Sequence, residues 1–178
     1  MAGWDYIVVG AGSAGCVLAE RLSVDPSVSV LVLEGGPADS NPFIHMPRGI
    51  PKIMFDPKWS YGFMTEPEAG NNQTPERWAR GKALGGSSSI NGMVYNRGQP
   101  ADYAAIAKLA GEEWGWQHIA RAYKAIENHE LGAAETRGDS GPLRITLNPR
   151  SEWGDRMIAA GKEMGIPHKL DVNEPDNG

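Results

Sequence analysis

A glycine-rich turn between two short apolar runs constrains the fold of this chain more than any other feature. Residues 4–9 are predicted to form a short buried strand, and a G-x-G-x-x-G turn follows at residues 10–15. From Ser13 onward, apolar residues recur at helical spacing until Asp25-Pro26. Residues 28–33 form a second apolar strand, expected to be buried on both faces. Strand, helix and strand within about 30 residues predict a βαβ unit with parallel strands.

The residues of this turn suit a dinucleotide. Gly10 permits the tight turn, Gly12 lets the backbone approach a pyrophosphate, and Gly15 lets helix and strand pack closely. The helix that begins at Ser13 and Ala14 offers unpaired N–H groups to the phosphate. Glycines of this spacing also serve ordinary turns, so the motif alone is weak.

Glu34 strengthens the prediction. It lies 19 residues after Gly15, at the end of the second strand, where a carboxylate is expected to accept hydrogen bonds from an adenosine ribose. An acidic residue there disfavours a 2′-phosphate, which makes NADP the least favoured ligand. FAD and NAD remain as candidates.

A second glycine–serine turn lies at residues 80–93. Gly85 and Gly86 would let the backbone approach a ligand closely, and the serines at 87–89 can cap a helix start. This arrangement suits an anion or a heteroaromatic ring. The alternative is a Gly-Gly turn followed by a serine N-cap.

Residues 81–91 followed by 93–98 resemble the first signature of the glucose–methanol–choline family of flavin oxidoreductases. Further stretches similar to that family are found at residues 5–15, 31–36, 59–61 and 97–103. The resemblance extends over essentially the whole chain and implies FAD, with Glu34 on the adenosine ribose. It also implies that Ser87–Val94 contacts the flavin and its phosphates, and that Trp59 and Gly81 help close the site.

Motif and resemblance together give these cofactor-binding residues: Gly10, Gly12, Ser13, Ala14, Gly15, Glu34, Trp59, Gly81, Gly85, Gly86, Ser87, Ser88, Asn91, Gly92, Met93 and Val94. Some family members carry a histidine before the asparagine that matches Asn91, and it bonds covalently to the flavin. This chain has Ile90, so non-covalent FAD is expected. None of the four histidines matches a family catalytic motif, so no catalytic residue is assigned.

The resemblance implies the FAD-binding part of an enzyme that oxidises an alcohol by hydride transfer to the flavin. Family members are much longer than 178 residues, and their catalytic histidine comes from a later part. The chain could therefore be a non-catalytic fragment, or a subunit of a split enzyme whose partner chain carries that histidine. A flavin-dependent lyase of the same family and an NAD dehydrogenase are further alternatives.

The predicted fold class is α/β, a Rossmann-like βαβ domain that is incomplete on its own. Residues 1–147 form the FAD-binding portion, including a flavin-contacting excursion at 35–98 with a short hairpin near 59–64. Residues 148–178 begin a segment leading toward an absent substrate domain. Helices are expected in the serine run, from Pro100 to Leu109, along the face of 119–126, and after Ser151; residues 142–147 are expected to form a strand.

Composition excludes several classes. The net charge is −5 and no dense Lys/Arg run occurs, which argues against nucleic-acid binding. Cys16 is the single cysteine, so the chain has no internal disulfide or metal cluster, and its thiol is expected to be buried. No apolar run is long enough to span a bilayer, and no secretory signal is recognisable, which predicts a cytoplasmic protein.

Overall fold

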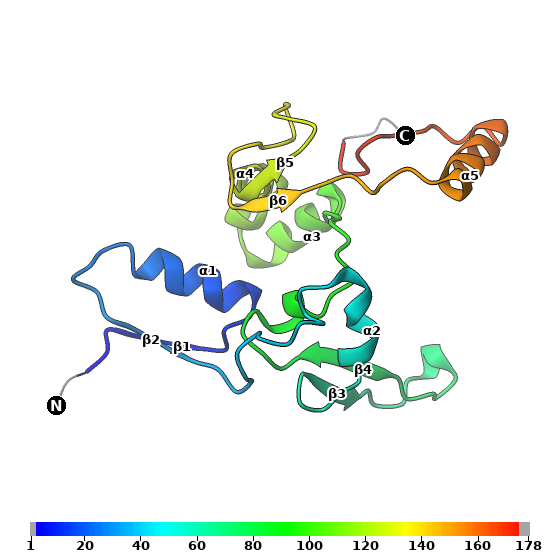
Figure 1. Cartoon of the computed structure of the whole chain (residues 1–178). Coiled ribbons are helices and arrows are strands. Elements are labelled where there is room, and N and C mark those ends of the chain that lie inside the picture. Colours follow the sequence, from blue (N-terminus) through cyan, green and yellow to red (C-terminus); the bar gives the residue numbers. More distant parts are fainter. Residues whose placement is uncertain (1–2, 175–178) are drawn as a thin grey trace. The chain divides into compact units, whose positions relative to one another are not determined.

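The computed structural model describes residues 3–174, which divide into two compact units (Figure 1). The first unit ends at Val94 and the second begins at Tyr95. The predicted boundary near residue 147 stays a prediction. Among the described helices, none has the length and apolar character needed to cross a membrane.

The first unit opens with the predicted βαβ arrangement. Strand β1 (Tyr6–Val9) leads into helix α1 (Ser13–Leu22), and the chain returns in strand β2 (Val30–Leu33). The two strands are parallel, with Tyr6 opposite Val30. The predicted parallel pair and its crossover helix are confirmed.

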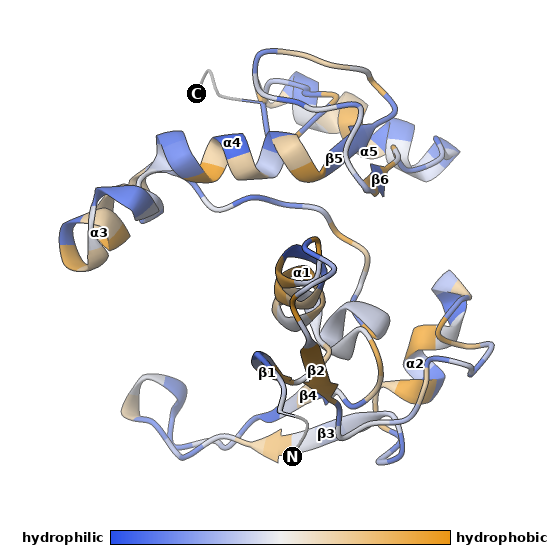
Figure 2. Cartoon of the chain, turned by 90° about the vertical axis from the view of Figure 1, so that its left-hand side faces the viewer, coloured by the Kyte–Doolittle hydropathy of each residue, from blue (hydrophilic) through white to orange (hydrophobic). Residues whose placement is uncertain are grey.

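Burial of this sheet differs from the prediction, which placed both strands inside the protein. Val8 is the buried residue of β1, whereas Val9 is 83% exposed and Leu33 is 48% exposed. The sheet has two strands, so its outer edges and much of its surface lack neighbouring strands or helices among the described residues. Figure 2 shows the hydrophobic character of β2 and α1. The apolar residues of these strands predicted burial on both faces. Among the described residues, too few elements pack against the sheet to bury them.

The excursion that follows contains more regular structure than predicted. A 3-10 turn, η1 (Pro47–Gly49), runs into helix α2 (Ile50–Ile53). The expected hairpin is present as antiparallel strands β3 (Ser60–Met64) and β4 (Arg77–Gly81), and the connection between them includes the 3-10 turn η2 (Ala69–Asn71).

The helix expected in the serine run is a single 3-10 turn, η3 (Gly86–Ser89). The hydroxyl of Ser88 donates to the carbonyl of Gly85, 2.5 Å away, and that of Ser89 donates to Leu84 at 2.7 Å. Serine hydroxyls that bond to nearby backbone compete with helix formation. The helix expected in the serine run is thus present, limited to one 3-10 turn.

A small hydrophobic core holds the second glycine turn in place. Ile53, Trp59, Ala83 and Ile90 form the buried cluster, with Phe43 and Ile44 packed against it. Ala83 and Ile90 lie on either side of the turn in the sequence. Burying both flanks fixes the path of the backbone between them.

The second unit is mainly helical and confirms the helices predicted there. It contains α3 (Pro100–Ala110), the 3-10 turn η4 (Glu112–Trp114), α4 (Trp116–Ile126), β5 (Glu127–His129), β6 (Leu143–Ile145) and α5 (Glu152–Glu163). Strands β5 and β6 are parallel. Ser151 caps α5 by accepting the N–H of Gly154 at 3.1 Å. The apolar stripe of α5 is exposed, including Trp153 and Met157.

Candidate functional site

The first glycine turn joins β1 to α1 in the geometry that its motif predicts. Gly10 has φ +92°, a left-handed conformation that favours glycine. A Cβ on Gly15 would overlap the carbonyl oxygen of Gly10, so strand and helix approach closely only because residue 15 is glycine. Gly12 is the N-cap of α1 and provides no side-chain cap, and Ser13 and Ala14 open the helix. The first N–H groups of α1 are therefore available to an anion.

Glu34 lies at the end of β2 and turns back toward the first glycine turn. Its Oε2 accepts the backbone N–H of Ala11 at 2.7 Å, and its Oε1 accepts that of Gly36 at 2.7 Å. A carboxylate has about four acceptor positions, so two remain for other donors. The carboxylate is half-buried at the edge of the turn. Glu34 thus still fits the ribose role that the resemblance implies.

The second glycine turn is bound together by its own serines. Ser87 accepts the N–H of Gly81 at 3.1 Å, which links the end of β4 to η3. A Cβ on Gly81 would overlap the carbonyl oxygen of Gly86, so these two glycines allow close backbone contact. The turn thus combines hydrogen bonds of serine hydroxyls with close main-chain contact.

The two glycine turns meet. The N–H of Gly85 donates to the carbonyl of Ala11 at 2.7 Å, and Gly12 and Gly85 form a parallel bridge. A Cβ on Gly86, where φ is +56°, would lie 2.9 Å from the Cα of Gly12. The structure thus brings together glycine motifs more than 70 residues apart in the sequence, which sequence reasoning had treated separately.

Other predicted residues lie differently. Trp59 is 5% exposed and belongs to the core, so its ring supports the second turn from the interior. Asn91 accepts the N–H of Met93 at 2.9 Å, and Gly92 has open space around its Cα. Met93 and Val94 are exposed apolar residues at the end of the first unit. These last four residues are available to a ligand, although protein packing does not fix them as it fixes the turns.

Three cations lie in or next to the hairpin strands. Each lies over an aromatic ring: Arg77 over Phe55, Arg80 over Trp78 and Lys82 over Tyr61, with 4.8–5.3 Å to the ring centroids. Cation–π contacts of this kind hold the charges at the surface of the hairpin.

Cys16 corrects a prediction, because its side chain is exposed rather than buried. The thiol donates to the carbonyl of Ala11 at 3.3 Å. Ser13 and Ala14 in the same helical turn are exposed as well.

Sequence reasoning missed Ala11 itself. It is 3% exposed, its N–H donates to Glu34, and its carbonyl accepts from Gly85. Ala11 occupies the first variable position of the motif. Its small side chain was therefore the single sequence feature that could have predicted its burial.

Sequence reasoning also missed a buried charged cluster in the second unit. The side chains of Arg97 and Glu127 form an ion pair and are 3% and 0% exposed. Tyr95 donates to Glu127 at 2.6 Å, and the N–H of Gly138 donates to the other carboxylate oxygen at 3.0 Å. Burial opposes ionisation of Glu127, yet hydrogen bonds from Tyr95 and Arg97 hold its pKa below the usual range.

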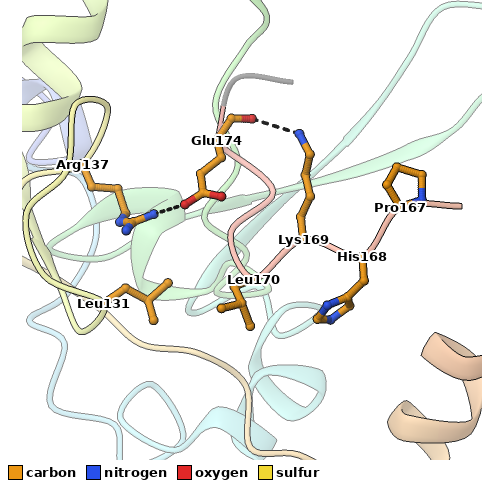
Figure 3. Close-up of a pocket in the computed structure, with 7 residues that line it drawn as sticks. All are labelled: Leu131, Arg137, Pro167, His168, Lys169, Leu170 and Glu174. Atoms are coloured by element: carbon orange, nitrogen blue, oxygen red, sulfur yellow. Dashed lines mark hydrogen bonds and ion pairs between the residues drawn. The ribbon is translucent and has the colours of Figure 1, made fainter. Parts of the chain in front are cut away.

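The second unit also contains a cleft of about 500 Å³, shown in Figure 3. Arg137 pairs there with Glu174, whose carbonyl accepts from Lys169 at 3.2 Å. His168 and Leu170 also line it. None of the predicted cofactor residues lines this cleft.

Comparison with known proteins matches residues 4–177 to the model of the GMC oxidoreductase family. An alcohol dehydrogenase (acceptor) from Pseudomonas putida is 46% identical over 175 residues, covering 96% of this chain and 31% of the relative. An oxygen-dependent choline dehydrogenase from Vibrio vulnificus is 43% identical, with 96% and 31% coverage. The chain thus spans about a third of the length of these relatives.

Solved structures give the same result. Pyridoxine 4-oxidase from Mesorbium loti superposes with a TM-score of 0.88 at 37% identity, covering 96% of this chain and 34% of that protein. An FAD-dependent oxidoreductase from Chaetomium thermophilum superposes with a TM-score of 0.79 at 28% identity, covering 97% and 31%. These likenesses confirm the predicted α/β, Rossmann-like fold class.

Proposed function

The chain belongs to the GMC oxidoreductase family, and on that premise we propose that it is the FAD-binding part of an oxidoreductase acting on the CH–OH group of an alcohol. This is a family of FAD-binding proteins, as the resemblance in the sequence implied. The predicted cytoplasmic location stays a prediction.

The joining of the two glycine turns carries this proposal. A side chain on Gly86 would overlap the Cα of Gly12, so the two turns present main-chain atoms to each other beside the start of α1. Main-chain atoms at the start of a helix suit a pyrophosphate, because N–H groups and the helix dipole favour negative charge. Glu34 keeps acceptor capacity beside it for a ribose hydroxyl. The residues present therefore fit FAD.

Each part of the site has a distinct task. The turn at Gly10–Gly15 would bind the pyrophosphate, Glu34 the adenosine ribose, and the Ser87–Val94 segment the flavin end. FAD, when bound, would supply an acceptor for the hydride that leaves the carbinol carbon. The chain's own contribution is to bind and orient, since it offers no assigned base for the hydroxyl proton.

FAD binding is the direct test. Titration of the purified chain into FAD should quench flavin fluorescence, and NAD at the same concentration should not compete. Gly86→Ala should raise the Kd for FAD at least about tenfold, because residue 86 combines a left-handed backbone with close contact to Gly12. Gly70→Ala is the matched control, since a Cβ there meets open space. Binding of NAD but not FAD would refute the proposal.

We further propose that the flavin is held without a covalent bond. Ile90 is an apolar side chain, 6% exposed, within the core cluster, and it carries no nucleophile. Denaturation of the loaded protein should therefore release all flavin into the soluble fraction. Flavin that remains attached to the polypeptide would contradict this assignment.

The exposed sheet favours a second candidate, that the chain works together with further polypeptide. Ile7 and Val9 are 58% and 83% exposed, which is unusual for apolar residues of a parallel sheet. The relatives are about three times longer than this chain. We propose that polypeptide equivalent to the rest of those relatives, in the same chain or in a companion, covers this sheet and brings the catalytic histidine.

Native mass spectrometry of the protein from its own source tests this candidate. A complex containing this chain, a larger companion and one releasable FAD would support a split enzyme. The isolated 178-residue chain should be marginally stable, so a sharp, reversible thermal transition would count against the need for further polypeptide. The flavin-dependent lyase is a separate alternative. Reduction of the bound flavin by an alcohol under anaerobic conditions would exclude it.

A further inference from the structure

Three backbone segments of the candidate site are joined to one another in pairs. The N–H of Gly85 donates to the carbonyl of Ala11 at 2.7 Å, which joins the second glycine turn to the first. The N–H of Leu84 donates to the carbonyl of Pro37 at 3.0 Å, which joins the second turn to the segment after β2. Glu34 closes the triangle, because its carboxylate accepts the N–H of Ala11.

The hydrogen bond between Glu34 and Ala11 differs from the other two bonds of the triangle because its acceptor is a side chain. A substitution at residue 34 can remove that bond while leaving the backbone atoms of the other two in place. Its second oxygen accepts the N–H of Gly36, which fixes the carboxylate to its own turn. The carboxylate is thus anchored on one side and reaches the first glycine turn on the other.

Close packing makes the triangle rigid. A Cβ on Gly36 would overlap the backbone of Lys82 and Ala83, so the segment after Glu34 lies directly against the start of the second turn. Ala83 is fully buried and Ala11 is 3% exposed. A shift at any corner would therefore have to displace the other two.

We infer that Glu34 is a positioning residue that fixes the spacing between the two glycine turns, in addition to any contact with a ribose. The inference rests on the proposed function only where the cofactor is concerned, because the triangle is a property of the chain itself. Since one turn would bind the adenosine diphosphate half and the other the flavin half, their spacing sets how well both halves bind at once.

Amide hydrogen exchange on the chain without cofactor tests the coupling. In Glu34→Gln, one oxygen becomes an NH2 group that cannot accept a hydrogen bond, so one of the two carboxylate bonds is lost. The inference expects the amides of Gly85 and Leu84, which do not touch Glu34, to exchange at least about threefold faster. Faster exchange confined to Ala11 or Gly36, the two donors to the side chain of residue 34, would overturn it. Glu76→Gln, the same change at an exposed carboxylate that accepts from Trp78, is the matched control.

Comparison of FAD with ADP gives a second readout. If Glu34 served only the ribose, Glu34→Gln would raise the Kd for ADP and for FAD by the same factor, because both contain that ribose. Coupling of the turns predicts a larger factor for FAD, about tenfold beyond that for ADP. Equal factors would overturn the inference. Failure of the unsubstituted chain to bind FAD would instead refute the proposed function and leave the exchange test intact.

A measurement without substitution covers the case in which Glu34→Gln does not fold. A joined triangle opens as one unit, so the amides of Ala11, Gly36, Leu84 and Gly85 should share one opening free energy in the unsubstituted chain. A spread of protection factors of more than about tenfold among them would contradict the coupling.

Discussion

Backbone contacts dominate the central feature of the first unit, whereas side-chain interactions form that of the second unit. In the first unit, main-chain atoms of two glycine turns meet, and the carboxylate of Glu34 accepts the N–H of Ala11 in the first of them. In the second unit, the side chains of Arg97 and Glu127 form a buried ion pair that Tyr95 completes. The first arrangement leaves acceptors and N–H groups open to a ligand, whereas the second satisfies its own charges.

This difference shows what each unit can tolerate. A site made of backbone depends on the absence of side chains, so added atoms should disrupt it more than lost side chains. A buried ion pair depends on both partners, because removing one leaves an uncompensated charge away from water. Adding a side chain should therefore destabilise the first unit most, whereas removing one should destabilise the second unit most.

The largest effect is expected from Glu127→Ala. This change leaves the guanidinium of Arg97 buried without its carboxylate, which should lower the free energy of unfolding of the second unit by about 3–5 kcal/mol. Urea denaturation monitored by hydrogen exchange in residues 116–145 would measure it. Glu152→Ala, which removes an exposed pair with Arg156, should cost less than about 1 kcal/mol. Equal losses of unfolding free energy for the two substitutions would show that the second unit does not depend on its buried ion pair.

The next effect concerns an added atom in the first unit. Gly15→Ala places a Cβ against the carbonyl of Gly10 where α1 crosses β1, and should destabilise the first unit by about 1–3 kcal/mol. Hydrogen exchange in residues 6–33 would report the loss. Gly70→Ala should leave that exchange unchanged, and a comparable loss there would show that steric contact is not the cause.

Acid should weaken the second unit through Glu127. Its pKa lies below the ordinary value of 4.5 in the folded unit, so the unfolded chain takes up this proton first as the pH falls. The stabilisation is therefore complete above about pH 4.5 and is lost as the pH falls toward the lowered folded pKa. Unfolding measured between pH 6 and pH 3 should show a steeper loss than in Glu127→Gln. Identical slopes would mean that another group carries the dependence.

The smallest effect is expected from removing a side chain at the backbone-built site. Cys16→Ala deletes a weak thiol donor to Ala11 and should change stability by less than about 0.5 kcal/mol. Calorimetry of the two proteins would compare them. A loss above about 1 kcal/mol would show that the thiol contributes more to the first turn than a weak hydrogen bond.

Local features of the first unit could be predicted because the sequence itself contains their cause. Gly10 and Gly15 have no side chain where the backbone turns and crosses, and Glu34 follows a strand at the expected distance. The helices at α3 and α5 were equally predictable, since Pro100 and Ser151 mark where they begin.

Long-range features could not be predicted in the same way. The contact between Ala11 and Gly85 depends on how the whole excursion folds back, which no short pattern encodes. Glu127 follows an amphipathic helix and looks like any polar residue until Arg97, 30 residues away, is placed beside it. The exposure of Val9 and Leu33 is likewise invisible in the sequence, because an apolar run predicts burial without showing which elements pack on it.

The exposed faces of β1 and β2 have a further consequence during synthesis of a longer protein that contains this chain. If the further polypeptide proposed above follows this region in one chain, this region leaves the ribosome first, at about 5–20 residues per second. Its apolar strands would then stay uncovered for tens of seconds while that further polypeptide was synthesised. During that interval a chaperone or a pairing strand could occupy the exposed edge before the native partner arrives.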